Sequence, residues 1–334
     1  MSREAKVICV TPVRNEAWIL DRFLACASVW ADHIIVADQS STDGSREIVS
    51  RFPKARLVDN PTTGYDEGAR QRLLLDEARR IPGRRLIVAL DADEALGANA
   101  LEDPEWERLR HAPEGTVAWF DWVNVLPGFS KCWIPRERVP FAFVDDGAPH
   151  DGSTIHSTRI PVGDAAPSLE LERVKVLHFQ HVAWRRMKGK QRWYQCWEAV
   201  NNGGKRPIQI YRQYHRMDCF PESELRPVEE AWIAGYEARA ISIRDLPDDG
   251  DYWDAEVVAW LAEHGPEPFR RLAIWDVDWQ EVARRAGREV PEDVLRDPRG
   301  PLERAVHEWL RRTQPRAGST RVRLGQRALT PLGW

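Results

Sequence analysis

The sequence lacks the short motifs that mark several common enzyme classes. No two of its 21 glycines are separated by a single residue, so the G-x-G of a dinucleotide-binding fold is missing. The chain also contains no G-K-[ST] of a P-loop, no H-E-x-x-H of a zinc protease and no G-x-S-x-G of an α/β-hydrolase. These absences remove the main support for a dehydrogenase, a P-loop NTPase, a zinc protease or a hydrolase of those types.

Cysteine and long apolar runs are also scarce. The five cysteines include no C-x-x-C pair and are odd in number, which suits reduced thiols better than a disulfide framework or a zinc site. No apolar run approaches the roughly 18 residues that a membrane-spanning helix needs. The first six residues are mostly polar and the apolar run after them ends at Pro12, so no signal peptide is recognised. We therefore expect a cytoplasmic protein.

The charges are nearly balanced. The chain has 48 basic and 52 acidic residues, a net charge of -4 that does not make nucleic acid the default partner. Hydrophobic residues make up 43% of the chain, which is enough to build a core. Two types are in excess: 16 residues are tryptophan, and all but seven of the basic residues are arginine. A GC-rich genome explains the arginine excess as simply as a function does.

Strand-like and helix-like segments alternate through the first third of the chain. Short β-branched segments separated by helices predict an α/β fold with a mainly parallel sheet flanked by helices. In such sheets, ligands bind beyond the carboxyl ends of the strands. Three expected strands end near an acidic residue, namely Asp38, Asp59 and Asp91. The strands are expected at 6–12, 33–38, 55–60 and 85–90, and the helices at 16–30, up to about 51, and 66–81.

The segment after the fourth expected strand carries an acidic pair, Asp91-Ala92-Asp93. If this segment is extended, alternation places both carboxylates on one side of the chain. Two such groups can hold Mg²⁺ or Mn²⁺ together with phosphate oxygens and water. The simpler alternative is that Asp93 or Glu94 caps a helix that starts near Gly97.

Three motifs occur in order over residues 10–49 and 86–96. They are Thr11-Pro12-Val13-Arg14-Asn15-Glu16, then Asp38-Gln39-Ser40-Ser41-Thr42-Asp43, then Asp91-Ala92-Asp93. With them the chain resembles the family 2 glycosyltransferases of the GT-A fold, closely over 6–96 and loosely to about 190. The resemblance implies a GT-A-type, Rossmann-like domain over 1–190, with a nucleotide-sugar half (1–96) and an acceptor half (97–190). Residues 191–334 would form a mostly helical extension.

The resemblance also implies roles for individual residues. The first motif would lie against the nucleotide, Asp38 would take the base, and Gln39 stands where the family has a second Asp. Asp91, with Ala92, would lie nearer the ribose, and Asp93 would bind the metal. Arg70, in the A-R-Q that follows, would lie near the base or the phosphates. The expected donor-binding residues are thus Thr11, Pro12, Val13, Asn15, Glu16, Asp38, Arg70, Asp91, Ala92 and Asp93.

The chemistry that the resemblance implies is a single displacement with inversion at the sugar, assisted by Mn²⁺ or Mg²⁺. A carboxylate would remove the proton of the acceptor hydroxyl. Asp146 is the first choice for this base and Asp145 the second; the alternative is a solvated turn before Gly147. A histidine after the acceptor strands would complete the metal site. His178 is favoured over His181, because alternation in 174–182 places it with Val174 and Val176.

A basic and aromatic stretch lies at 184–197. Arg185, Lys188 and Lys190 are expected to clamp the donor diphosphate when a loop closes near Gly189. The same composition would suit single-stranded nucleic acid, or simply a solvated surface. Further along, helices are expected at 228–241, 252–264 and 302–312. The segment 311–334 has six arginines and no acid, so it is either a disordered tail or a weak anchor to an anionic membrane at its inner face.

These features predict a glycosyltransferase that uses a nucleotide-diphosphate sugar, with a UDP-sugar as the favoured donor. The acceptor would be a saccharide, a lipid-linked molecule or another small molecule. Three other readings stay open. A nucleotidyltransferase would normally need a glycine-rich loop after the first strand, and residues 12–18 contain no glycine. A nucleic-acid-binding protein, or an enzyme that glycosylates modified DNA bases, would use the basic stretch and the arginine-rich segment.

Overall fold

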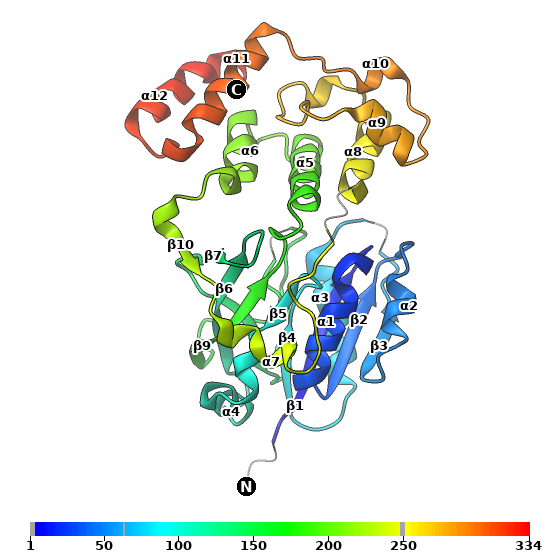
Figure 1. Ribbon diagram of the computed structural model, residues 1–334, viewed down its shortest axis with the longest axis vertical. Helices are drawn as coiled ribbons and strands as arrows, with labels where there is room; N and C mark the ends of the chain where they lie inside the picture. The colour runs from blue at the N-terminus through cyan, green and yellow to red at the C-terminus, as the bar shows by residue number, and fades with distance from the viewer. Residues whose placement is uncertain (1–3, 63, 156, 248–250) are drawn as a thin grey trace. The chain divides into compact units, whose positions relative to one another are not determined.

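The computed structural model describes residues 4–62, 64–155, 157–247 and 251–334. It divides the chain into two compact units (Figure 1). The sheet unit comprises Met1–Val182 and Arg226–Pro247, and the helical unit comprises Ala183–Leu225 and Asp248–Trp334. The sequence placed the division at residue 190, but helix α5 (Trp184–Asn201) runs through that position without a break.

Four strands of the sheet unit are parallel and run in the expected places. They are β1 (Lys6–Val13), β2 (His33–Asp38), β3 (Ala55–Asp59) and β4 (Arg85–Ala89). β1 pairs with β2 on one side and with β4 on the other, and β3 extends the sheet beyond β2. Buried β-branched residues fill both faces of β1 and β2, as a sheet covered on both sides requires.

The remaining strands make the sheet mixed. Its order is β10-β7-β6-β8-β4-β1-β2-β3, with β9 against both β5 and β6. β8 lies antiparallel to β4, and this pairing decides where its end residues lie. These strands are β5 (Glu94–Leu96), β6 (Val117–Val125), β7 (Lys131–Trp133), β8 (Val139–Val144), β9 (Ser168–His178) and β10 (Leu225–Pro227).

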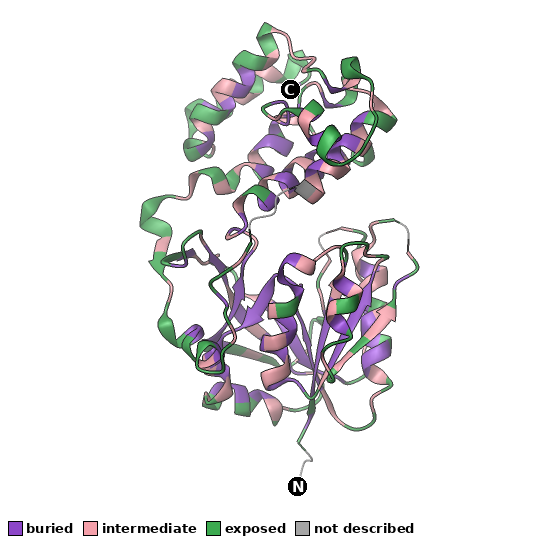
Figure 2. Cartoon of the chain, turned by 45° about the vertical axis from the view of Figure 1, so that its right-hand side comes forward, coloured by how far each residue is buried: buried purple, intermediate pink, exposed green. Residues whose placement is uncertain are grey.

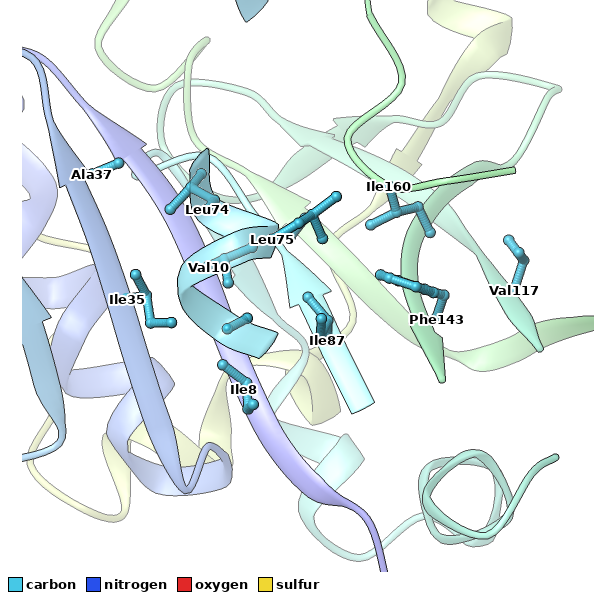
Figure 3. Close-up of a cluster of buried hydrophobic side chains, with 12 residues drawn as sticks. Ile8, Val10, Ile35, Ala37, Leu74, Leu75, Ile87, Val117, Phe143 and Ile160 are labelled. Atoms are coloured by element: carbon cyan, nitrogen blue, oxygen red, sulfur yellow. The ribbon is translucent and has the colours of Figure 1, made fainter. Parts of the chain in front are cut away.

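Helices α1 (Ala17–Trp30) and α3 (Glu67–Arg79) cover opposite faces of the parallel strands. The chain steps one way from β1 to β2 and the other way from β3 to β4, so right-handed crossovers place the two helices on opposite sides. On the α3 side, Leu74 and Leu75 pack against Ile8, Val10 and neighbouring strand residues (Figure 3). The sheet unit also contains the shorter helices α2 (Ser45–Val49) and α4 (Pro104–Arg110).

The helix expected at 228–241 does not form as one element. The segment contains only the 3₁₀ turn Glu230–Trp232 and the short helix α7 (Ala234–Glu237). Ile233 and Tyr236 are fully buried, and the Tyr236 hydroxyl donates to the carbonyl of Leu96 at 2.8 Å. Packing of residues 228–241 against the sheet unit therefore outweighs the helical spacing of their apolar side chains, and one continuous helix does not form.

The helical unit confirms a mostly helical C-terminal extension, and with the sheet it confirms the expected fold class. Its helices are α5, α6 (Pro207–Tyr214), α8 (Asp251–His264), α9 (Trp279–Arg285), α10 (Glu292–Leu295), α11 (Pro301–Thr313) and α12 (Thr320–Leu329). Within the described ranges, no helix combines the length and the apolar character that crossing a membrane requires.

The expectation of a disordered tail is wrong. Residues 320–329 form α12, and the 3₁₀ turn Thr330–Leu332 follows it. Trp334 is 1% exposed and packs with Tyr211, Val306 and Leu310, which belong to α6 and α11. In Figure 2 the helices of this unit combine buried and exposed residues, whereas the central strands of the sheet unit are mostly buried. Burial of the large aromatic side chain of Trp334 ties the end of the segment to the core of the helical unit.

Candidate active site

The expected nucleotide motifs meet at one edge of the sheet. Because β1, β2 and β4 are parallel, their carboxyl ends point the same way. Val13 is paired with Asp38, and the amide of Leu90 donates to the carbonyl of Val10 at 3.1 Å. The chain leaves β1 toward β2 on one side while β4 flanks the other, which is the arrangement that opens a ligand crevice in such sheets.

The segment Asp91–Glu94 is a turn and not an extended strand. The amide of Glu94 donates to the carbonyl of Asp91 at 3.0 Å, and the amide of Asp91 donates to Glu94 Oε2 at 2.8 Å. The alternation argument for Asp91 and Asp93 therefore does not apply. Nor do these acids cap a helix, because the 3₁₀ turn Ala98–Leu101 begins after Gly97 without a side-chain cap.

Asp93 and His178 are brought together, as the sequence predicted for the metal pair. β5 lies antiparallel to β9 and pairs Glu94 with His178, and the amide of Phe179 donates to the carbonyl of Asp93 at 2.8 Å. His178 Nε2 lies 3.6 Å from Asp93 Oδ2, and both residues are buried, at 4% and 8% exposed. The expected strand over 174–182 ends at His178, so His181 lies beyond it.

The orientation of the His178 ring is fixed by contacts on the side of the ring away from Asp93. Its Nδ1 lies 2.8 Å from Asn124 Oδ1, and Asn124 Nδ2 donates to the carbonyl of Trp122 at 3.3 Å. The Trp122 ring stacks on the imidazole at 4.4 Å between centroids. Since an amide oxygen only accepts, Nδ1 carries a proton, and Nε2 is the ring nitrogen that faces Asp93.

An imidazole nitrogen and a carboxylate oxygen 3.6 Å apart can share a cation, either a proton on Nε2 or a metal ion. Of the two expected metals, Mn²⁺ accepts an imidazole ligand more readily than Mg²⁺, which prefers oxygen, and two ligand bonds of about 2.1 Å can span such a gap. Within the described residues there is no cluster of three or more His, Cys, Asp or Glu side chains placed to hold a metal. Metals of this type commonly take their other ligands from phosphate and water.

Arg159 was missed by the sequence analysis and lies at the centre of the acidic turn. Its two terminal nitrogens contact Glu94, and Nη2 also donates to Asp91 Oδ2 at 2.8 Å. The guanidinium lies over the Phe141 ring at 4.8 Å. Arg159 comes from an irregular segment with no periodic pattern, so only the excess of arginine hinted at it.

Glu94 is the most buried acidic group of this turn, with 1% of its surface exposed. Its Oε1 also accepts from Trp122 Nε1 at 2.8 Å. Burial raises the pKa of Glu94; Asp91 adds to this rise, whereas Arg159 and His178 oppose it. Arg159 in turn has its pKa raised by Asp91 and Glu94 against the effect of burial. The turn therefore contains a compact charge pair that positions Asp91 beside the Asp93–His178 pair.

Asp38 lies at the end of β2 and is 1% exposed. Its Oδ2 accepts from Arg46 Nη1 at 2.7 Å and from the amide of Ser41 at 3.2 Å. Its Oδ1, like Thr11 Oγ1, has no hydrogen-bond partner among the residues that the structure describes. Buried polar atoms of this kind usually find a partner, so these two mark a place where a ligand could supply one.

Gln39, which replaces the family's second Asp, faces a neighbouring loop. Its Nε2 donates to the carbonyls of Thr62 and Gly64 at 2.7 and 2.8 Å. Arg46 also reaches Asp59 at 2.8 Å and so joins the ends of β2 and β3. Gln39 therefore braces the loop after β3.

The residues after β1 are bound to those after β2. Asn15 adopts a left-handed conformation with φ of 55°, and its Oδ1 accepts from the amide of Thr42 at 2.8 Å. The amide of Glu16 donates to Ser45 Oγ at 3.1 Å. Asp43 Oδ2 accepts from the amide of Ala17 at 2.9 Å and caps the start of α1. Much of the N-E and S-T-D pattern is thus explained by holding these two loops together.

The other predicted donor residues are also at this end of the sheet unit. Val13 is buried, Pro12 is half-buried and Ala92 is buried within the acidic turn. Arg70 lies in the first turns of α3, where its guanidinium sits 5.4 Å from the centre of the Tyr65 ring and 3.9 Å from Glu67. Because α3 starts after β3, Arg70 is on the carboxyl side of the sheet, as the resemblance implied.

Asp145 and Asp146 are not at this edge, which corrects their prediction as general base. β8 runs antiparallel to β4, and the amide of Asp145 donates to the carbonyl of Arg85, the first residue of β4. At about 3.3 Å per residue, the chain from Arg85 to Asp91 spans roughly 20 Å. The predicted base therefore lies at the opposite edge from the acidic turn.

Asp145 has a structural environment. Its side chain is fully buried and pairs with Arg79 at 3.0 Å and with Arg85 at 2.8 Å. Burial alone would raise the pKa of Asp145, but the hydrogen bonds from the two guanidinium groups outweigh it and hold the pKa below its usual range. Asp146 is exposed, as the solvated-turn alternative expected.

Arg185, Lys188 and Lys190 belong to the helical unit, where no loop exists at Gly189. All lie within α5, and a Cβ at Gly189 would come within 3.2 Å of Trp253 Cβ and Asp254 Oδ1. Lys188 pairs with Asp218 at 2.5 Å. Gly189 therefore permits close contact between α5 and α8, and the expectation of a closing loop there is wrong.

The chain was compared with known proteins. No protein-family model matches it, and no curated protein matches it. Similar solved structures include mannosyl-3-phosphoglycerate synthase from Rubrobacter xylanophilus, with 17% identity and a TM-score of 0.27 over 37% of this chain and 41% of that one. Another is 4-diphosphocytidyl-2C-methyl-D-erythritol synthase, with 12% identity and a TM-score of 0.28 over 43% of this chain and 76% of that one.

A third is glucosyl-3-phosphoglycerate synthase from Mycobacterium tuberculosis, in complex with Mn²⁺, uridine-diphosphate and phosphoglyceric acid. It has 19% identity and a TM-score of 0.25 over 37% of this chain and 44% of that one. The chain thus matches less than half the length of either phosphoglycerate synthase. At these scores the similarity is partial, and the fold class rests on the strand order and pairing described above.

Proposed function

We propose that this protein is a metal-dependent glycosyltransferase that moves a sugar from a nucleotide-diphosphate sugar to an acceptor hydroxyl. The observation that carries the proposal is the meeting of Asp93 Oδ2 and His178 Nε2 at 3.6 Å, at the ligand-binding edge of the sheet. Asp38 and the acidic turn lie at the same edge, at the ends of β2 and β4. A cation at the pair would be placed to meet the diphosphate of a nucleotide whose base reaches β2.

Asp93 and His178 would hold Mn²⁺ or Mg²⁺, and Asn124 would keep the His178 lone pair directed at it. When bound, the metal offsets the negative charge that develops on the departing nucleotide diphosphate. Arg159 neutralises part of the charge of Asp91 and Glu94, which limits repulsion of an anionic donor. Asp91, whose side chain is 31% exposed, is the member of the turn that can reach a ribose hydroxyl.

The state of Asp38 favours a uracil or thymine base over guanine. Arg46 and the Ser41 amide occupy its Oδ2, which leaves Oδ1 as a single acceptor. A uracil ring offers a single imide N–H to a carboxylate oxygen, whereas guanine offers two adjacent donors that suit two oxygens. Thr11 Oγ1, the second buried polar atom without a partner in the described chain, could bond another atom of the same nucleotide.

Inversion is proposed from the family resemblance. The acceptor oxygen would attack the anomeric carbon from the face opposite the diphosphate, so one bond forms as the sugar–phosphate bond breaks. The proposal assigns Asp91 and Asp93 to the donor and metal and Glu94 to the charge pair with Arg159. None of the three removes the acceptor proton in this scheme, and Asp145 and Asp146 are too distant to do so.

The test is thermal unfolding of the full chain with Mn²⁺ and UDP, GDP or dTDP. We expect UDP with Mn²⁺ to raise the melting temperature, because a ligand that binds only the folded state stabilises it. Asp93→Asn should remove the shift, and the control Asp146→Asn should keep it. The proposal is wrong if no nucleotide shifts the wild-type protein, or if Asp93→Asn responds as the wild type does.

The products separate glycosyl transfer from nucleotidyl transfer. A glycosyltransferase releases the nucleoside diphosphate from a UDP-sugar, whereas a nucleotidyltransferase consumes UTP and a sugar phosphate and releases pyrophosphate. We expect UDP release that depends on Mn²⁺ and is lost in His178→Asn. Pyrophosphate release without UDP release would reverse the assignment while leaving the metal site in place.

A further inference from the structure

The outer face of α12 combines positive charge with exposed apolar side chains. From Trp309 to Trp334 the chain has six arginines and no acidic residue. The name α12 face is used for the side chains of Arg321, Arg323, Leu324 and Arg327 on α12, together with Arg316 and Leu332 on the 3₁₀ turns that flank the helix. All six are exposed, and none takes part in the candidate active site.

The four arginines of the α12 face differ from their neighbours in α11. Arg311 and Arg312 both pair with Glu308, at 2.8 and 2.5 Å. The guanidinium groups of Arg316, Arg321, Arg323 and Arg327, by contrast, make no hydrogen bond or ion pair with any residue in the described ranges. The face therefore carries four uncompensated positive charges.

The apolar part of the face is Leu324, 58% exposed, and Leu332, 50% exposed. In a helix of 3.6 residues per turn, Leu324 lies one turn from both Arg321 and Arg327 and beside Arg323. Leu324 thus stands in the middle of the outward face with arginines around it. Few large apolar side chains are this exposed in the described chain, so the position of Leu324 beside the arginines is informative.

The face is held rigidly in this orientation. Ser319 caps α12, and Val322 is buried at 7% exposed. Gly325 lies so close to α11 that a Cβ there would come within 2.7 Å of the Trp309 ring. Arg206 Nη1 donates to Thr330 Oγ1 at 2.7 Å and fixes the end of the helix to α6. The packing side of α12 is therefore opposite Leu324, which cannot turn inward without breaking these contacts.

We propose that the α12 face docks onto a membrane surface of anionic phospholipid. Arginines can meet lipid phosphates while their aliphatic stems lie along the apolar boundary, and exposed leucines can enter it. The phosphate backbone of a nucleic acid would satisfy the arginines but offers no place for Leu324 and Leu332. An acidic protein would likewise leave them in contact with water, so the combination favours a lipid surface.

The test is co-sedimentation of the full chain with vesicles of phosphatidylcholine, with and without phosphatidylglycerol. We expect binding only to the anionic vesicles, and less of it as salt rises from about 0.1 M to about 1 M. Since each arginine near such a surface is worth about fivefold in binding, Arg323→Ser with Arg327→Ser should weaken it about 25-fold. Leu324→Gln should also weaken binding, which a purely electrostatic partner would not require.

Matched controls separate the face from general charge and apolarity. Arg108 and Arg136 are exposed arginines of the sheet unit, and replacing both by Ser removes the same net charge. Leu302, on α11, is 50% exposed and serves as the control for Leu324. We expect Arg108→Ser with Arg136→Ser, and Leu302→Gln, to bind as the wild type does.

Other outcomes would overturn the proposal. Equal binding to neutral and anionic vesicles would remove the role of the arginines. Equal loss in the control variants would show that the face has no special part. Absence of vesicle binding, with salt-sensitive binding of a single-stranded oligonucleotide that Leu324→Gln leaves unchanged, would assign the face to nucleic acid instead. None of these readouts depends on catalytic activity.

Discussion

Nε2 of His178 lies 3.6 Å from Oδ2 of Asp93, and Nδ1 on the far side of the ring bonds to Oδ1 of Asn124. The two residues are far apart in sequence, and the antiparallel pairing of β5 with β9 brings them together. The pairing therefore does more than extend the sheet. It sets the acidic turn against a histidine whose ring is oriented by Asn124 and Trp122.

Asn124→Ala should weaken Mn²⁺ binding. Without the amide oxygen, His178 can place its proton on Nε2 and lose the lone pair that faces Asp93. Loss of such a supporting residue typically costs 10- to 100-fold in metal affinity, so we expect about that loss in a Mn²⁺ titration followed by electron paramagnetic resonance. Asn99→Ala removes a side-chain hydrogen bond to the Arg173 carbonyl elsewhere in the sheet unit and should leave Mn²⁺ affinity unchanged.

Arg159→Met should destabilise the protein by about 3 to 5 kcal/mol, because it leaves buried Glu94 without its charge partner. Replacing both members, Arg159→Met with Glu94→Gln, should restore part of that loss. Urea unfolding followed by circular dichroism gives the free energies. A single variant as stable as the wild type would show that the pair is not a structural element of the turn.

The strands that build this site could be predicted because their sequences are distinctive. Residues 33–38 and 85–89 are short, apolar and β-branched, and each is followed by polar turn residues, so both the strands and their acidic ends were recognised. The sequence alone predicts Asp93 and His178 as metal ligands, and the structure places their side chains together. The family resemblance supplied their roles, and alternation along β9 favoured His178 over His181.

Asp145 and Asp146 could not be placed in the same way. The sequence pattern of a strand such as β8 does not indicate whether it pairs parallel or antiparallel with its neighbour. That direction decides which edge of the sheet its final residues reach. No sequence pattern indicates the position of Arg159, because it lies in an irregular segment and is fixed by contacts with residues distant in sequence. The helix expected at 228–241 failed because burial of Ile233 and Tyr236 outweighs local spacing.

Asp145→Asn should destabilise the protein without changing nucleotide binding. The lowered pKa of Asp145 means that its ionised form stabilises the fold above its usual pKa, and that this stability is lost as the pH falls through the folded-state value. At neutral pH we expect a loss of about 2 to 4 kcal/mol in urea unfolding, because two guanidinium groups lose their partner.

Asp146→Asn should be neutral in the same assay, because the Asp146 side chain is exposed. The UDP–Mn²⁺ melting shift should be unchanged in both variants. Loss of turnover in Asp146→Asn with full stability would restore Asp146 as the general base and contradict the placement argued above.

Gly189→Ala should destabilise the helical unit even though alanine is the better helix former. The added Cβ would meet Trp253 Cβ and Asp254 Oδ1 at 3.2 Å, where α5 and α8 pack closely. Overpacking of this kind costs about 1 to 3 kcal/mol, more than the gain of about 1 kcal/mol in helix propensity. Gly318→Ala, at a glycine with open space around it, is the control. A stabilised Gly189→Ala protein would show that the two helices can separate at little cost.

His307 should make the helical unit sensitive to acid. Burial lowers the pKa of His307 to about 4, and the nearby Arg299 and His215 lower it further, while the hydrogen bond to the Arg271 carbonyl and the charge of Asp297 oppose this. The ring packs against Tyr211 and Trp334, and the residue is 7% exposed, so little water reaches it in the folded unit. The folded unit therefore holds His307 neutral at pH values where the unfolded chain already binds a proton.

The stabilising effect of neutral His307 is fully present above about pH 6.5 and is lost as the pH falls toward about 4. The loss should reach about 3 kcal/mol, measured as the opening free energy of α11 by hydrogen exchange of the full chain. His307→Gln keeps hydrogen-bonding capacity but cannot take up the proton, so its profile should be flatter over this range by that amount. Parallel profiles for the two proteins would show that His307 titrates normally and is reached by water in the folded state.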